Sequence, residues 1–321
     1  MSKKPWYERW RWLFMTVASL AALVWTILLL RDALPELRAD LPRLQAWWLL
    51  LPLAGCIACG YIGFEAFRAL LLHVKPQVYG RLALGHLYFV AQLMKHLPGR
   101  VWGVAYQTTA GNQVNLAIWA SVTVTHMVIA TGVAVWMALA VMGFACSLEW
   151  GALALALGLA AYVLGWHQRP LTMLLALINK LPGRMFARAG AALLPFVEAS
   201  LRFKLRILLL FGSYWLVYLV SWAGYGLAWP GLSPVDGMVL CALYTIAWMA
   251  GYFSVITPSG LGVRELVFVF LAHRFPPDAV AGLAIFGRAM LLVADILLGA
   301  FFGPFVPTQP KTSNVDPTTL S

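Results

Sequence analysis

Long apolar segments alternate with short polar ones along most of the chain. A helix that crosses the hydrocarbon core of a bilayer needs about 20 mainly apolar residues. Six segments come close to that length or exceed it, so we predict six full spans, at residues 12–30, 46–72, 114–144, 148–165, 206–229 and 279–303. The pattern is typical of an all-α, polytopic integral membrane protein.

Two further apolar stretches, at about residues 82–110 and 238–273, are each interrupted near the middle. The first interruption is Leu-Pro-Gly-Arg at residues 97–100, and the second is Pro-Ser-Gly-Leu-Gly-Val-Arg-Glu at residues 258–265. Hydrocarbon tolerates broken backbone and ionised side chains only where they are buried in protein or line a polar cavity. We therefore predict that each stretch enters the bilayer and returns as a re-entrant pair of half-helices.

The composition agrees with a membrane protein, because 62% of the residues are hydrophobic and only 11% are charged, against about 25% charged in soluble domains. The longest polar parts are a basic loop at about residues 166–205 and a tail at 304–321, both too short for a soluble domain. We expect residues 1–303 to form one transmembrane domain and the tail to be disordered. The six His and four Cys show no metal-ligand spacing, and no nucleotide-binding or protease motif occurs. We therefore expect no metal, no cofactor and no enzymatic activity.

The formal charge of +11 lies mainly between the apolar segments, where it sets orientation in the membrane rather than binding nucleic acid. With a cytoplasmic N-terminus and two re-entrant pairs, fourteen Lys and Arg fall on the cytoplasmic side and four on the outer side. This asymmetry predicts a cytoplasmic (inner) membrane, with both termini in the cytoplasm. The two interruptions then enter from opposite sides, an arrangement typical of inverted-repeat transporters.

Eight charged residues remain at membrane depth in this topology: Arg68, Lys95, Arg100, Arg264, Arg288, Glu65, Glu265 and Asp295. Glu65 and Arg68 are three apart on one helix and are able to pair, so we interpret Arg68 as structural. Arg288 and Asp295 are seven apart and share a face of the last span. For Lys95, a structural role and a role in a binding site are equally supported.

Arg100 and Arg264 each follow a helix break and therefore lie in the first turn of a new half-helix. Unpaired backbone N–H groups and the positive end of the helix dipole favour an anion there. Arg suits bidentate contact with a phosphate. Gly260 and Gly262 would let the backbone approach a ligand closely.

The structural alternative is that a carboxylate, Glu265 or Asp295, holds Arg264 in place. Ionisable residues within a membrane are by default candidates for a functional site, so we favour the binding interpretation. The predicted substrate site comprises Gln92, Lys95, Pro98, Gly99, Arg100, Gly260, Gly262, Arg264, Glu265, Arg288 and Asp295.

The two interruptions also resemble motifs of a known family. Residues 92–102, Gln-x-x-Lys-x-Leu-Pro-Gly-Arg-Val-Trp, resemble the "KYLPG-K/R-V" element of the lysylphosphatidylglycerol synthase transmembrane region, a group of flippase-like membrane proteins. Residues 258–265 resemble its "PGGLGVRE" element, and residues 284–295 resemble its Arg-bearing last helix. This chain has His96 where the family usually has Tyr and Ser259 where it usually has Gly.

The resemblance implies a protein that moves lipids across the bilayer. Family members differ in cargo, which includes aminoacylated phospholipids, polyisoprenyl-linked sugars and hopanoid-related lipids. Some carry an aminoacyl-transferase domain, but only a short polar tail follows the last span here. We therefore do not carry synthase activity over to this chain.

Together these observations predict transbilayer movement of an anionic lipid or lipid-linked intermediate. Arg100 and Arg264 would hold the headgroup phosphate, with Glu265 and Asp295 as exchangeable counter-charges. The alternative is a non-transporting membrane protein that binds lipid as the partner of a lipid-modifying enzyme, a glycan-assembly enzyme or a glycosyltransferase. A membrane-embedded enzyme is the third and least favoured hypothesis, because the acidic residues are few and not clustered.

Overall fold

The computed structural model describes residues 44–76, 79–94, 102–111, 113–165, 196, 198–253 and 262–307, and the statements below concern these residues. Every regular element in them is a helix. After a short 3₁₀ helix, η2 (Ala46–Leu49), the α-helices are α2 (Leu50–Val74), α3 (Arg81–Met94), α4 (Trp102–Ala110), α5 (Leu116–Cys146), α6 (Leu148–Gly165), α9 (Leu201–Ser221), α10 (Ala223–Ala228), α11 (Pro234–Phe253), α12 (Val263–Leu271) and α13 (Pro277–Phe302).

Five of these helical segments are long and apolar enough to cross a membrane: Ala46–Val74, Leu116–Cys146, Leu201–Ala228, Pro234–Gly251 and Pro277–Phe302. The prediction of an all-helical, multi-pass membrane protein is therefore confirmed at this level. Four of the five coincide with predicted spans, and the predicted span at 148–165 is the 18-residue helix α6. The predicted span at 12–30 lies outside the described residues.

The second predicted re-entrant pair corresponds to two helices of unequal length. α11 has 20 residues and contains one of the five potential spans, whereas α12 has only nine. α11 begins at Pro234, earlier than predicted, because Ser233 and Asp236 cap its start. The Ser233 N–H donates to Asp236 Oδ2 at 2.8 Å, and the Asp236 N–H donates to Ser233 Oγ at 3.2 Å. The full length of α11 is thus set by polar capping residues that precede the apolar run.

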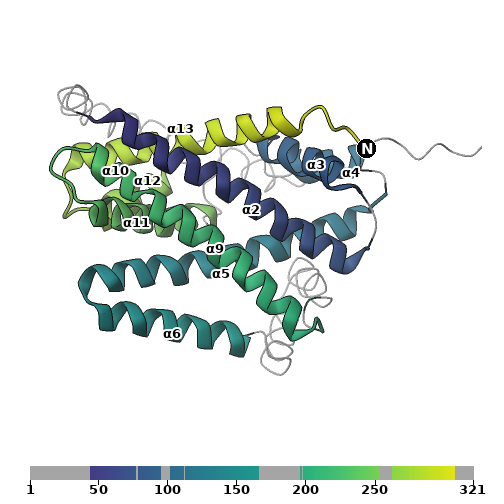
Figure 1. Cartoon of the computed structure of the whole chain (residues 1–321), viewed down its shortest axis with the longest axis horizontal. Helices are drawn as coiled ribbons and strands as arrows, with labels where there is room; N and C mark the ends of the chain where they lie inside the picture. The colour runs from purple at the N-terminus through teal and green to yellow at the C-terminus, as the bar shows by residue number, and fades with distance from the viewer. Residues whose placement is uncertain are drawn as a thin grey trace, which may run out of the picture.

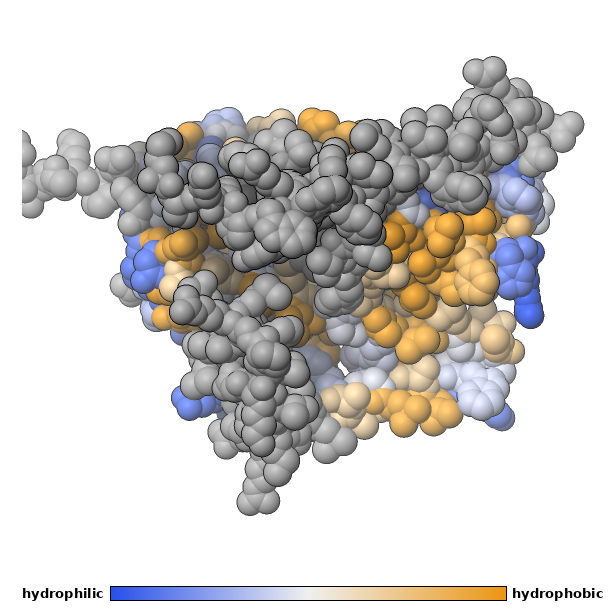
Figure 2. Space-filling view, turned by 180° about the vertical axis from the view of Figure 1, so that it is seen from behind, coloured by the Kyte–Doolittle hydropathy of each residue, from blue (hydrophilic) through white to orange (hydrophobic). Residues whose placement is uncertain are grey.

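The long helices lie side by side, roughly along the longest axis of the molecule (Figure 1). α2 packs against α9, α13 and α5. The pair α3 and α4 lies toward one end of this axis, and α11 and α12 lie toward the other, beside α10 (Figure 1). α5 and α13 contact helices of both pairs. On the face shown in Figure 2, hydrophobic residues lie between hydrophilic residues at the two ends of the axis, as expected if this axis crosses the membrane.

Aromatic side chains fill the centre of the bundle where α2, α3 and α13 meet. The Phe64 ring is fully buried, and its centroid lies 5.7 Å from that of Tyr88, 5.5 Å from that of Phe89 and 5.8 Å from that of Phe302. These separations are typical of packed aromatic pairs. The close approach of α2 to α3 needs Gly63, since a Cβ there would lie 3.2 Å from the Tyr88 hydroxyl.

Side-chain hydrogen bonds tie both ends of α13 to other helices. At its end, His86 of α3 donates from Nδ1 to the Gly303 carbonyl at 2.7 Å and accepts at Nε2 from the Tyr106 hydroxyl at 2.6 Å. At its start, the Trp229 indole N–H donates to Asp278 Oδ2 at 3.1 Å. α13 is therefore anchored to the α3–α4 pair at one end and to the region after α10 at the other.

Candidate functional site

The residue just before α12 has a backbone conformation that only glycine adopts easily. Gly262 has φ +84°, in the left-handed region. Its N–H donates to Oε2 of Glu265 at 2.8 Å, three residues further on. The Glu265 carboxylate therefore bends back over the first turn of its own helix, where a negative charge is favoured by the helix dipole and by the unpaired N–H groups.

The other oxygen of the same carboxylate binds two arginines. Arg264 Nε donates to Glu265 Oε1 at 3.0 Å, and Arg288 Nη2 of α13 donates to the same oxygen. Glu265 is buried, with 7% of its surface exposed. We call these three residues the Glu265 cluster. It answers the question that the sequence left open: the carboxylate that holds Arg264 is Glu265.

The Glu265 cluster lies far from either end of α13. Arg288 is eleven residues after Pro277 and fourteen before Phe302, which corresponds to about 17 Å and about 21 Å of helix. α13 is long and apolar enough to cross a membrane, and in a helix that does so the middle would lie near the centre of the bilayer. Charged groups at that depth are costly and usually functional.

The charges of the Glu265 cluster do not cancel. Two guanidinium groups share one carboxylate, which leaves an excess of one positive charge among the described residues of the cluster. The Arg264 side chain is 14% exposed and the Arg288 side chain 40% exposed. Both retain donors beyond those bound to Glu265, because a guanidinium has five N–H groups.

An aromatic ring with an unused hydroxyl lies beside the cluster. The Tyr244 ring of α11 lies 5.3 Å from Arg264 Cζ, within the range of a cation–π contact. Tyr244 is 2% exposed, yet among the described residues its hydroxyl has no hydrogen-bond partner. The buried indole N–H of Trp222 also has none there. Both rings lie against Gly287, next to Arg288, where a Cβ would be 3.2 Å from the Tyr244 ring and 3.6 Å from the Trp222 ring.

Sequence analysis did not single out Tyr244 or Trp222. An unsatisfied buried donor costs about 1–3 kcal/mol, which makes the Tyr244 hydroxyl beside the cluster a notable feature. The chain holds 11 Tyr and 15 Trp, and nothing in their local sequence distinguishes these two. Only the packing of α11 and the α9–α10 junction against Gly287 reveals them.

Two further predicted site residues, Asp295 and Gln92, lie on α13 and α3. Asp295 is two helical turns beyond Arg288 on α13, within electrostatic range of Tyr88 and Tyr214. Gln92 of α3 hydrogen-bonds with the Tyr88 side chain. Arg288 and Asp295 therefore lie on one face of α13, with Arg288 paired to Glu265 of α12 and Asp295 close to Tyr88 of α3. Lys95, Pro98, Gly99, Arg100 and Gly260 lie outside the described residues.

A second group of charges, which we call the Glu65 cluster, comprises Glu65, Arg68 and Arg81. Arg68 Nη1 lies 3.2 Å from Glu65 Oε2, so the predicted pair is present. Arg81, at the start of α3, donates from Nε to Glu65 Oε1 at 2.9 Å. The Arg81 side chain is 51% exposed, as expected for a residue that reaches toward water.

In comparisons with known proteins, no protein-family model matches the chain, and no curated protein or solved structure is significantly similar to it. The fold and composition define a class, that of helical, multi-pass membrane proteins. Within that class, the chain is distinguished by a buried carboxylate shared between two arginines at the middle of its last long helix.

Proposed function

We propose that this protein moves an anionic lipid or lipid-linked intermediate across the bilayer, with the headgroup phosphate bound at the Glu265 cluster. The observation that carries the proposal is the excess of one guanidinium over carboxylate at the middle of α13. An isolated excess cation in hydrocarbon is costly, and a monoanionic phosphate would neutralise it. The Tyr244 hydroxyl, which has no partner among the described residues, would supply a further donor for a phosphate oxygen, since its ring lies 5.3 Å from Arg264 Cζ.

Glu265 supports an exchange mechanism. Without lipid, its carboxylate occupies the position that suits an anion, between two guanidinium groups and the start of α12. A phosphate that enters beside Arg264 and Arg288 would replace part of these contacts, so neither arginine passes through an unpaired state. Arg suits this exchange because its planar group binds carboxylate and phosphate with similar geometry.

The placement of the helix pairs is compatible with alternating access. The α3–α4 and α11–α12 pairs lie toward opposite ends of the long axis, and both contact α13 and α5 (Figure 1). Motion of one pair against the other around a fixed central site is the general mechanism of repeat-built transporters. Arg100, with Pro98 and Gly99, would reach the same site from the first pair, and Asp295 would be an exchangeable counter-charge.

Membership of the lysylphosphatidylglycerol synthase transmembrane region is part of this proposal. It rests on the two motifs at residues 92–102 and 258–265. The cytoplasmic membrane, with both termini on the cytoplasmic side, is proposed from the distribution of Lys and Arg.

A second candidate is a non-transporting lipid-binding partner of a lipid-modifying or glycan-assembly enzyme. One observation favours it: Glu265 pairs with both arginines, as it would in a purely structural cluster. In that case, lipid recognition would depend on the surface cations, and changes at the Glu265 cluster would affect stability alone.

The two candidates are separated by lipid transport in proteoliposomes that contain fluorescent phosphatidylglycerol or phosphatidylcholine. The variants Arg264→Gln and Arg288→Gln each leave Glu265 paired with one arginine, so the fold is expected to survive. Loss of one buried charged contact costs about 2–5 kcal/mol, which predicts at least about thirtyfold slower movement of phosphatidylglycerol. Arg68→Gln, which makes the same change in the Glu65 cluster, is the matched control and is expected to retain the wild-type rate.

Wild-type rates in folded Arg264→Gln and Arg288→Gln proteins would refute the binding site. If wild-type protein moved no lipid above the background of empty liposomes, the transport proposal would fail and the partner hypothesis would replace it.

A further inference from the structure

The outward face of α9 carries exposed side chains along its length. They recur every three or four residues, at 202, 205, 206, 209, 213, 216 and 220, and α9 packs on α2 and α5 through its other side. Near the beginning of the helix, this outward face contains a hollow of about 600 Å³. Its described lining consists of Arg202, Leu205, Arg206, Leu209, Leu210 and Ser213. Two arginines are therefore part of the hollow itself.

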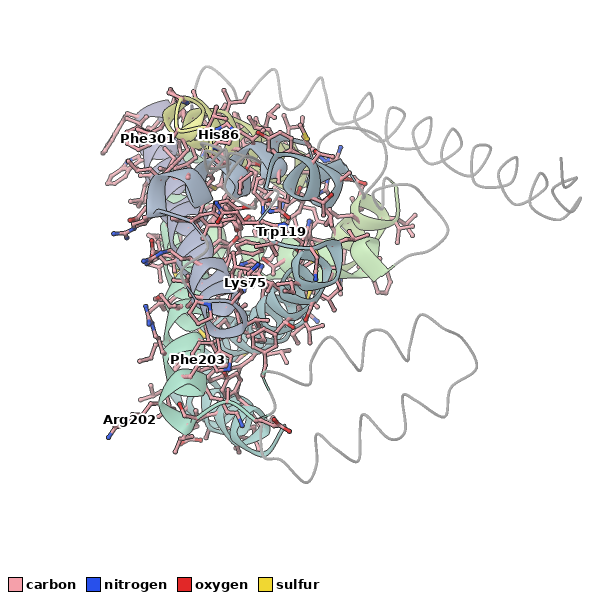
Figure 3. All side chains as sticks on the ribbon, turned by 90° about the vertical axis from the view of Figure 1, so that its right-hand side faces the viewer. Lys75, His86, Trp119, Arg202, Phe203 and Phe301 are labelled. Atoms are coloured by element: carbon pink, nitrogen blue, oxygen red, sulfur yellow. The ribbon has the colours of Figure 1, made fainter. Side chains whose placement is uncertain are left out.

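The two arginines lie at one end of the hollow. They are four residues apart, so their side chains share one side of the helix. Figure 3 shows Arg202 pointing away from the bundle, whereas the next residue, Phe203, stacks on the His73 ring of α2 with 4.2 Å between ring centroids. Both Arg202 and Arg206 are exposed, and neither forms an ion pair with a described residue. The arginines of the Glu65 and Glu265 clusters, by contrast, each bind a carboxylate.

The rest of the hollow is apolar. The Leu205 side chain is 43% exposed and that of Leu209 is 72% exposed. The Ser213 hydroxyl donates to the Leu210 carbonyl at 3.0 Å, so its hydrogen-bonding need is met within its own helix. The hollow thus offers positive charge at one end and an apolar surface over the remainder, in the order in which a phospholipid carries its phosphate and its acyl chains.

The length of the span indicates the depth of these groups. The segment Leu201–Ala228 has 28 residues and is long and apolar enough to cross a membrane. As a helix it measures about 42 Å, which exceeds the hydrocarbon thickness of about 30 Å. Arg206 is about 33 Å from the end of this segment at Ala228. In a bilayer that the segment crosses, both guanidinium groups would lie at headgroup level, with Leu209 in the hydrocarbon.

We propose that this face of α9 binds an anionic phospholipid, with its phosphate at Arg202 and Arg206 and an acyl chain along Leu205 and Leu209. Two adjacent guanidinium groups suit a phosphate because each donates hydrogen bonds in a planar, bidentate arrangement. The lipid comes from the leaflet at the N-terminal end of α9. This inference does not rest on the proposed transport function, because the residues of the Glu265 cluster lie on α12 and α13.

Charge and apolar surface together favour this occupant over others. A second copy related by a two-fold axis along the membrane normal would bring the same end of each chain to the same membrane face. The arginines of both copies would then lie near one another, which is unfavourable. A free phosphate would leave the exposed leucines uncovered, and a zwitterionic lipid would bring a positive group close to the arginines. An anionic phospholipid meets both requirements.

Four variants and their controls test the two parts of the hollow. Arg202→Gln/Arg206→Gln removes both charges, Arg202→Lys/Arg206→Lys keeps them, and Arg274→Gln changes an exposed arginine outside α9. Leu209→Ala removes an apolar contact, and Leu216→Ala truncates an exposed leucine of the same helix that does not line the hollow. All of these side chains are exposed, so each variant is expected to fold.

The measurement uses two lipid probes, phosphatidylglycerol and phosphatidylcholine, that carry the same photoreactive acyl chain. The full chain is labelled with each in phosphatidylcholine nanodiscs, and labelled α9 peptides are quantified by mass spectrometry. Each cation near a membrane surface favours anionic lipid by about fivefold, so the wild-type ratio of the two labels should approach about 25. The ratio should fall to near one in Arg202→Gln/Arg206→Gln and persist in Arg202→Lys/Arg206→Lys and Arg274→Gln. Leu209→Ala should weaken α9 labelling, and Leu216→Ala should not.

Several results would overturn the proposal, and most need only unaltered protein. Equal labelling of wild-type α9 by both probes, or labelling no stronger than that of other lipid-facing helices, would indicate bulk lipid alone. Loss of the preference in excess inorganic phosphate would indicate a soluble anion. Disulfide crosslinking of two copies through Leu209→Cys would indicate a second chain as the occupant. A wild-type ratio in folded Arg202→Gln/Arg206→Gln would show that these arginines do not bind the phosphate.

Discussion

The Glu65 and Glu265 clusters have the same composition, one carboxylate shared by two arginines, but different surroundings. In the Glu65 cluster, Arg81 is half-exposed, at the start of α3. In the Glu265 cluster, the carboxylate also caps α12, and a buried aromatic ring covers Arg264. The first cluster can relieve its excess charge by reaching water. The second lies at the middle of α13, where, in the function proposed above, a lipid phosphate would balance the excess charge.

The largest difference between the clusters should appear when each carboxylate is neutralised. Glu265→Gln leaves two guanidinium groups without a counter-charge and should lower the free energy of unfolding by about 3 kcal/mol. Glu65→Gln should have a much smaller effect because Arg68 and Arg81 can hydrate. The thermal unfolding midpoints of both variants in detergent, followed by Trp fluorescence, test this. Equal shifts would remove the distinction between the clusters.

A substitution that keeps the positive charge tests whether the planar shape of the guanidinium group is needed as well as its charge. Arg264→Lys keeps the positive charge but loses the planar group that binds Glu265 and stacks on Tyr244, so we expect transport of phosphatidylglycerol to slow about tenfold. Arg68→Lys, the equivalent change in the Glu65 cluster, should stay near the wild-type rate. Initial rates in proteoliposomes provide the measurement. A slow Arg68→Lys variant would indicate that both clusters take part in transport.

The backbone at the start of α12 offers a smaller test. Gly262→Ala places a Cβ at φ +84°, which costs about 1 kcal/mol. Gly212→Ala lies within the regular helix α9 and should be neutral or slightly stabilising. The shift of the unfolding midpoint is again the readout. A neutral Gly262→Ala variant would mean that the left-handed conformation is not needed for the capping contact.

The smallest effect on stability is expected for removal of the Tyr244 hydroxyl. Comparison with the Tyr225 hydroxyl tests whether the Tyr244 group serves ligand binding or the stability of the fold. Tyr244→Phe removes a buried hydroxyl without a partner among the described residues, so stability should be unchanged or slightly higher while the KM for lipid rises. Tyr225→Phe removes a hydroxyl that donates to the Ala279 carbonyl at 2.6 Å and should cost about 1 kcal/mol. A destabilised Tyr244→Phe protein would assign that hydroxyl to the fold.

The structural features that depend on residues close together in the sequence were predicted correctly. Apolar segments of sufficient length located four of the five potential spans, because length and composition are local properties. The Glu65–Arg68 pair was predicted for the same reason, since both residues lie on one helix. The extent of α11 was not predicted, because its start depends on the capping contact between Ser233 and Asp236.

The charged site could be predicted only in part. The break before Arg264 indicated an anion site at the start of a half-helix. The partner of Arg288 was missed because Glu265 lies on a different helix, and periodicity within one helix does not show which helices are neighbours. Tyr244 and Trp222 are apolar span residues by sequence and become distinctive only through their packing against Gly287.

The single carboxylate of Glu265 performs two tasks. One oxygen accepts a hydrogen bond from the N–H of Gly262 just before α12, and the other accepts hydrogen bonds from both arginines. A group that draws this side chain away from the arginines therefore also releases the beginning of the helix. If a headgroup binds as proposed, its arrival and the loosening of the first turn of α12 would be one event, so the helix start would act as a latch. Faster amide hydrogen exchange at residues 262–266 on adding phosphatidylglycerol would reveal this release, and unchanged exchange would show that the two tasks are independent.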